Sequence, residues 1–163
     1  MLIYFYINAA IAILATLLTV TAKNAVHALL YFVVSLLALA ISMYLLGAPF
    51  VAALEVIIYA GAIMVLFVFV VMLLNVKPAS SQKYAPQGHI KNWLGPFSLL
   101  ILLILELVFV FRDTEFLKRQ VVTVSAKEVA SALFTTYTLA VELTSFLLLA
   151  GLIGAYHIGK KRN

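Results

Sequence analysis

The sequence predicts an all-α integral membrane protein with five transmembrane helices. Hydrophobic residues make up 66% of the chain and charged residues only 10%, whereas soluble domains carry about 25% charged residues. Five apolar runs approach or exceed the length of about 20 residues that crosses a bilayer. They cover residues 2–21, 25–46, 51–74, 93–111 and 137–157. A β-barrel would instead alternate polar and apolar residues over segments of about ten residues.

Charged residues and prolines lie near the ends of the apolar runs. The first run has no Lys or Arg before Lys23 and is too long for the apolar core of a signal peptide, so we expect a retained helix. Pro49 separates the second run from the third. Pro96 is expected in the first turn of the fourth helix, where its missing N–H costs nothing.

Two polar connections complete a single transmembrane domain over residues 1–163. The first covers residues 75–92 and contains Pro78 and Pro86. The second covers residues 112–136, in which Ser125 and Glu128 have the spacing of a helix capping box. The apolar residues that follow predict a short amphipathic helix lying along the membrane surface.

The distribution of Lys and Arg predicts the orientation. When the connections and chain ends are assigned to alternate sides of the membrane, one side has seven basic residues and the other has four. The richer side holds Lys23, Lys77, Lys83, Lys91, Lys160, Lys161 and Arg162, and the poorer side holds Arg112, Lys118, Arg119 and Lys127. Because basic residues collect on the cytoplasmic side, the 75–92 loop and the C-terminus are expected in the cytoplasm, and the N-terminus and the 112–136 loop outside.

Composition also excludes several functions. The chain has no Cys, so it offers no thiolate for an iron–sulfur cluster, and its three His residues are too far apart for a local metal motif. No glycine-rich nucleotide motif occurs. The net charge of +5 comes from short clusters beside apolar runs, which indicates anionic lipid rather than nucleic acid as the partner.

Three carboxylates lie inside apolar runs: Glu55, Glu106 and Glu142. A charged side chain at the centre of a membrane helix costs about 2.5–3.5 kcal/mol on insertion scales, so each should face protein or water. Glu55 and Glu142 either reach the interface or hydrogen-bond a neighbouring helix. Glu106 either pairs with another subunit or stays protonated, and a structural role is favoured over proton relay.

The third run, from Ala53 to Leu73, holds the most distinctive pattern. Glu55 and Tyr59 are four residues apart and are expected on one helix face. The triplet Ala60-Gly61-Ala62 that follows has two interpretations. The residues alone favour a notch for close helix packing. The alternative is a π-bulge, whose insertion or removal would rotate the residues after it by about 100°.

The residues from Glu55 to Phe69 resemble the third-helix signature of subunit J of respiratory complex I, the NADH:quinone oxidoreductase. Residues 26–31 and 140–149 resemble the family as well. The resemblance thins between Asn75 and Thr123, so Glu106 inherits no family role. Ala25 stands where many relatives have proline, and Ala130 where glycine is common.

The resemblance implies a membrane-arm subunit that couples quinone reduction to proton translocation in the bacterial inner membrane and has no complete active site. It implies a π-bulge at Tyr59 and Gly61. The residues that it assigns to the proton path or to conformational coupling are Glu55, Tyr59, Gly61, Met64, Val65, Phe67 and Glu142. FMN, iron–sulfur clusters and quinone would be bound elsewhere in an obligate hetero-oligomer, with subunits of the A, H, K and N types as neighbours.

Two other functions are considered. A related membrane component of a multisubunit cation/proton antiporter shares modules with complex I but has no peripheral arm. A stand-alone channel or assembly scaffold is favoured least, because three spans carry acidic residues and none carries a basic residue inside it, so partners from other chains are expected.

Overall fold

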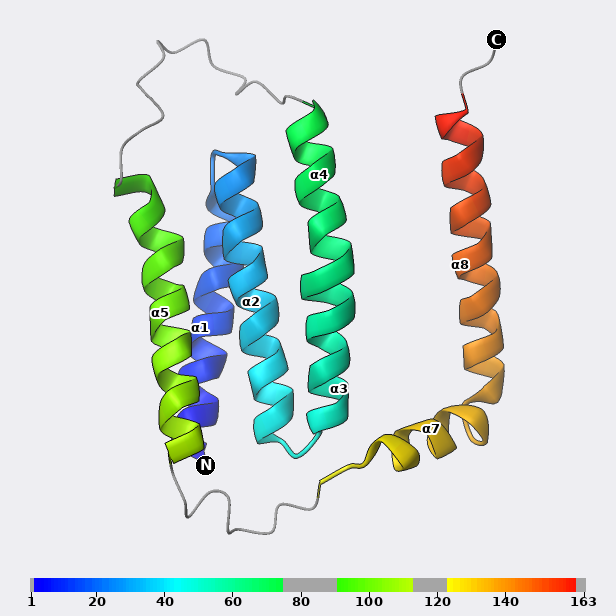
Figure 1. The fold of residues 1–163 in the computed structure, drawn as a ribbon, viewed down its shortest axis with the longest axis horizontal. Helices are drawn as coiled ribbons and strands as arrows, with labels where there is room; N and C mark the ends of the chain where they lie inside the picture. Colours follow the sequence, from blue (N-terminus) through cyan, green and yellow to red (C-terminus); the bar gives the residue numbers. More distant parts are fainter. Residues whose placement is uncertain (1, 75–90, 113–122, 161–163) are drawn as a thin grey trace. The chain divides into compact units, whose positions relative to one another are not determined.

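The computed structural model describes residues 2–74, 91–112 and 123–160, and its regular structure is helical throughout (Figure 1). In chain order the helices are α1 (Leu2–Thr21), α2 (Ala25–Leu45), α3 (Pro49–Leu54), the π-helix η1 (Glu55–Ile63), α4 (Met64–Leu74), α5 (Lys91–Arg112), α7 (Ala126–Phe134) and α8 (Thr138–Gly159).

Five spans of this part of the chain are long and apolar enough to cross a membrane, and α3, η1 and α4 join into one of them, Pro49–Leu74. The predicted all-α fold with five transmembrane helices is confirmed. Most of the 75–92 loop and residues 113–122 of the other connection lie outside the described residues, as do several of the basic residues counted for orientation.

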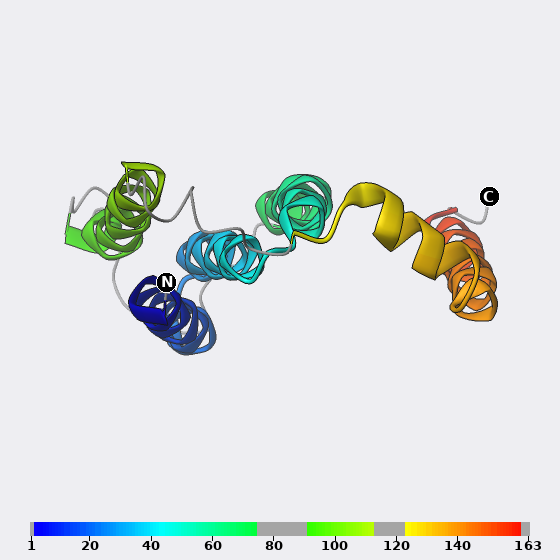
Figure 2. The same ribbon diagram turned by 90° about the horizontal axis from the view of Figure 1, so that it is seen from below.

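The chain divides into two compact units, residues 1–123 and 124–163. In the first unit, α2 is the central helix and contacts α1, α5 and each of the three segments of the third span (Figures 1 and 2). Helices α1 and α2 run in opposite directions, and α5 runs in the same direction as α2 (Figure 1). The apolar core lies where α1, α2 and α5 meet.

The core of this unit contains small residues from α1 and α2. The core cluster consists of Ile11, Ala15, Val34, Ala38 and Leu103. Lipid chains are as apolar as leucine, so helix association in a membrane depends on close packing and interhelical hydrogen bonds rather than on the hydrophobic effect. The two alanines of the cluster are fully buried, which is what such close packing requires.

Both ends of α2 are closed by local hydrogen bonds. At its start, the Asn24 side chain accepts a hydrogen bond from the N–H of Val26 at 2.9 Å, so the helix begins at Ala25 without a proline. At its end, Gly47 adopts φ 87°, a conformation that favours glycine. The N–H of Gly47 bonds the carbonyl of Tyr44, and the N–H of Ala48 bonds that of Met43, which is a Schellman motif.

Pro96 does not lie in the first turn of its helix, so that prediction is wrong. Helix α5 begins at Lys91, not at residue 93, and Pro96 lies inside it. A proline in a helix interior removes one backbone hydrogen bond and crowds the carbonyl four residues earlier. The two additional residues at the start of the helix, Lys91 and Asn92, are polar, which is why hydropathy alone placed the helix start too late.

The second unit contains α7 and α8. The capping box predicted for α7 is confirmed: the Ser125 hydroxyl accepts from the N–H of Glu128 at 3.3 Å, and the Glu128 carboxylate accepts from the N–H of Ser125 at 2.7 Å. Helix α7 continues through Ala130 without interruption. None of the residues of α8 that the structure describes is buried.

Candidate functional site

The third transmembrane span is not a continuous α-helix. Its middle third, Glu55–Ile63, is π-helical and is flanked by α3 and α4. At the C-terminal end of η1 the N–H of Met64 points to the carbonyl of Tyr59, five residues earlier, as well as to that of Gly61. The predicted π-bulge near Tyr59 and Gly61 is therefore confirmed, and of the two interpretations the π-bulge is correct. π-turns inside α-helices are rare overall, but those that occur are often found at functional sites.

Gly61 lies where a side chain would press on the widened turn. A Cβ built on Gly61 would lie 3.2 Å from the carbonyl oxygen of Val56, closer than nine in ten real Cβ contacts. Val56 is the residue whose carbonyl an i→i+5 turn brings to residue 61. Glycine at this position therefore avoids a close contact with the Val56 carbonyl, which the Cβ of any other residue would make.

The π-helix brings Glu55 and Met64 to the same packed side of the span. Glu55 is 8% exposed and Met64 is 1% exposed. They are nine residues apart, which is about two and a half turns of an α-helix and would place them on opposite sides. The wider turns of η1 reduce the rotation per residue, so both side chains face inward. Straightening the segment to an α-helix would turn Met64 away from that side.

The other predicted residues of this span lie differently. Tyr59 is 50% exposed, whereas Glu55 is 8% exposed. Val65 and Phe67, after the π-helix, are exposed.

Glu142 belongs to the second unit, where it lies on α8 and is exposed. On the same helix, the hydroxyls of Thr144 and Ser145 donate to the carbonyls of Ala140 and Glu142. Both hydroxyls are thus used within the helix itself.

Sequence analysis missed a set of polar contacts between α1 and α2. Asn8 is fully buried, and its Nδ2 donates to the carbonyl of Ala38 at 2.6 Å and to the hydroxyl of Ser42 at 2.7 Å. The signal that could have found it is simple: Asn8 is the only Asn inside the first apolar run, and a polar amide in a membrane needs a partner.

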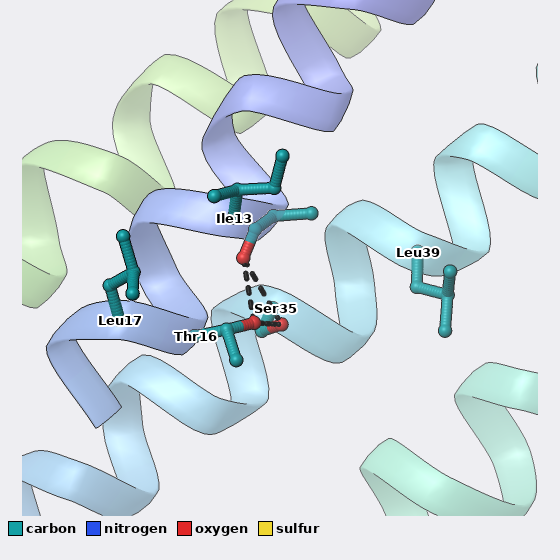
Figure 3. Close-up of a pocket in the computed structure, with 6 residues that line it drawn as sticks. Ile13, Thr16, Leu17, Ser35 and Leu39 are labelled. Atoms are coloured by element: carbon teal, nitrogen blue, oxygen red, sulfur yellow. Dashed lines mark hydrogen bonds between the residues drawn. The ribbon is translucent and has the colours of Figure 1, made fainter. Parts of the chain in front are cut away.

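A second hydrogen-bonded pair joins the same two helices nearer the other end of α1. The hydroxyls of Thr16 and Ser35 are 2.7 Å apart, and both lie within hydrogen-bond distance of the Ala12 carbonyl (Figure 3). They form the polar part of a shallow, open pocket of about 350 Å³ whose other walls are apolar, lined by Ala12, Ile13, Leu17 and Leu39. The pocket is a gap between packed helices and carries no titratable group.

The described part of the chain contains no cluster of potential metal ligands. Within it, no three His, Cys, Asp or Glu side chains lie together in a way that could hold a metal ion. Large apolar side chains of α4 and α8 face outward instead.

These features define a polytopic helical membrane protein with a π-helix in its third span. Its sequence matches the model of the NADH-ubiquinone/plastoquinone oxidoreductase chain 6 family over residues 15–158. The chain belongs to this family.

Curated relatives align over almost the whole chain. NADH-quinone oxidoreductase subunit J of Pseudomonas aeruginosa is 49% identical over 161 residues, which are 96% of this chain and 95% of that protein. The subunit J proteins of Escherichia coli strain K12 and of Buchnera aphidicola subspecies Schizaphis graminum are 46% and 40% identical, and the alignments cover 96% and 97% of this chain and 85% and 97% of those proteins. A component of a cation/proton antiporter is not favoured by these matches.

Proposed function

We propose that this chain is the J-type membrane subunit of a proton-pumping NADH:quinone oxidoreductase and that its third span couples quinone reduction to proton translocation. The observation that carries the coupling role is the π-helix η1, because a π-turn can convert to an α-turn and π-turns are frequent at functional sites. Family membership carries the assignment to the oxidoreductase.

The coupling element is the segment from Glu55 to Phe67. In the π-helical form Met64 is packed and Val65 and Phe67 face outward. Conversion of η1 to an α-helix rotates α4 about its axis, which exchanges the side chains that face the neighbouring helices. Because packed helices have discrete arrangements rather than continuous ones, such a rotation would open or close a path for water beside Glu55.

The carboxylates have a supporting role in this proposal. Glu55, which is buried in the first turn of η1, is the acid inside the coupling element. Glu142 on α8 faces a partner or water. Either carboxylate could fix helix packing as readily as it could carry a proton. Coupling is therefore assigned to the change in backbone conformation, and neither carboxylate is required to transfer a proton.

The chain acts within a hetero-oligomer and holds no redox group of its own. Outward-facing apolar side chains of α4 and α8 fit contacts with lipid and with other membrane subunits, for which subunits of the A, H, K and N types are the candidates. FMN, iron–sulfur clusters and quinone are assigned to other subunits. The excess of Lys and Arg on one side of the spans supports a cytoplasmic C-terminus and an external N-terminus.

The test is to delete the gene for this chain and then to restore it. In membranes of a deletion strain, NADH:quinone turnover and the accompanying proton translocation should both be lost and should return with the intact gene. A complex purified through a tag on this chain should contain NADH-oxidising peripheral subunits. Purification without such subunits, together with cation-dependent proton exchange, would instead assign the chain to an antiporter.

A further inference from the structure

Glu106 is the buried acid that the coupling proposal does not use. Its side chain is 6% exposed, and neither carboxyl oxygen has a hydrogen-bond partner. Asn8 on α1 is in a similar position, because its Oδ1 is buried and also lacks a partner. Buried polar atoms are nearly always hydrogen-bonded, so two such groups in one helical unit call for a common explanation.

Two contacts fix the register of α5 against α2. At one end, a Cβ on Gly95 would overlap the hydroxyl of Tyr31. At the other, the rings of Tyr44 and Phe111 lie 6.1 Å apart. Because the two helices run in the same direction (Figure 1), Glu106 lies opposite the stretch of α2 between Ala38 and Ser42.

Asn8 is bound to that same stretch of α2, since its Nδ2 donates to the carbonyl of Ala38 and the hydroxyl of Ser42. The core cluster gives the same register: Leu103, one turn before Glu106, packs in the cluster that contains Ile11, one turn after Asn8. Since α1 and α5 run in opposite directions (Figure 1), both steps lead to the same level of the bundle.

The chemistry of the two groups determines where a proton must be. Both N–H donors of Asn8 are used, so the amide has only an acceptor left. An ionised carboxylate also has only acceptors, whereas a carboxylic acid has one donor. Turning the Asn8 amide over would point its Oδ1 at the Ala38 carbonyl and leave two acceptors facing each other. A proton on Glu106 would supply the donor that Asn8 Oδ1 lacks.

We propose that Glu106 is an internal proton-binding site, held as a neutral carboxylic acid that donates directly to Asn8 Oδ1. The acid–amide pair ties α5 to α1 at the level where both contact α2. It also avoids an unpaired negative charge in the membrane interior. The proposal concerns the helices of this unit and holds whichever reaction the assembly catalyses.

The protonation state can be read by infrared spectroscopy of the membrane complex purified with this chain in place. At neutral pH, Glu106→Gln should remove one protonated-carboxyl C=O band, and the matched control Glu55→Gln should leave that band unchanged. Asn8→Leu should shift the band, because the acid loses its acceptor. Loss of carboxylate intensity in Glu106→Gln, or a band indifferent to Asn8→Leu, would overturn the proposal.

A pair of substitutions supplies an independent measurement. Glutamine keeps an N–H donor for Asn8 Oδ1, so Glu106→Gln should assemble and melt like the parent complex, whereas Glu106→Leu should lower both the yield of complex and its melting temperature. The double variant Asn8→Leu/Glu106→Leu should lose less than the sum of the single losses. Equal damage from glutamine and leucine, or strictly additive losses, would contradict the pair.

Discussion

Exchange of Gly61 for alanine should move η1 from the π-helical toward the α-helical form. The new Cβ would lie 3.2 Å from the Val56 carbonyl oxygen, where ordinary contacts begin at 3.4 Å. The carbonyl must therefore retreat by a few tenths of an ångström. A bend of about 7° in a backbone angle, which gives a movement of that size, costs about 1 kcal/mol. The α-helical form would then gain about fivefold in population over the π-helical form.

Gly151→Ala is the matched control for this exchange. Gly151 lies inside α8, and a Cβ there meets no heavy atom within 4 Å. Both exchanges replace a helical glycine by alanine and gain about the same intrinsic helix propensity, roughly 1 kcal/mol. A difference between the two variants therefore reports the contact with Val56 rather than the general effect of removing a glycine.

The assay measures NADH:quinone turnover and proton translocation in membrane vesicles, with the amount of assembled complex determined on the same preparation. We expect Gly61→Ala to assemble normally and to lower turnover and translocation together, by up to about fivefold, while Gly151→Ala stays at the parent level. If both variants keep full turnover and translocation, the π-helical form is not needed for coupling, and Gly61 only relieves local packing.

Three further variants test the packing of the chain. Gly95→Ala should lower the melting temperature of the complex because its Cβ overlaps the Tyr31 hydroxyl, and adding Tyr31→Phe should recover most of the loss; no recovery would exclude this contact as the cause. Met64→Ala, which empties a fully buried position, should destabilise the complex by up to about 2 kcal/mol, whereas exposed Val65→Ala should have little effect; equal shifts in melting temperature would contradict the inward orientation of Met64. Ser125→Ala should weaken α7 by about 0.5–2 kcal/mol through loss of its cap, visible as faster amide hydrogen exchange, and unchanged exchange would show the cap to be dispensable.

The candidate site was predictable from sequence only in part. Glycine at position 61 permits a π-turn, but a packing notch needs the same residue, so the residues alone favoured the wrong alternative and only the family resemblance indicated the π-bulge. The burial of both Glu55 and Met64 was not predictable at all, because their spacing of nine residues indicates opposite faces under α-helical geometry.

The sequence by itself determined the fold class, the five spans, the cap of α7 and the absence of Cys, since all of these depend on local composition and spacing. The tertiary structure alone decided which residues lie together. Asn8 binds Ala38 and Ser42, and Glu106 lies at the same level of the bundle. The physical reason lies in the solvent. In a membrane an apolar residue has no strong preference between lipid and protein, so hydropathy identifies the spans but says little about which face of each helix is packed.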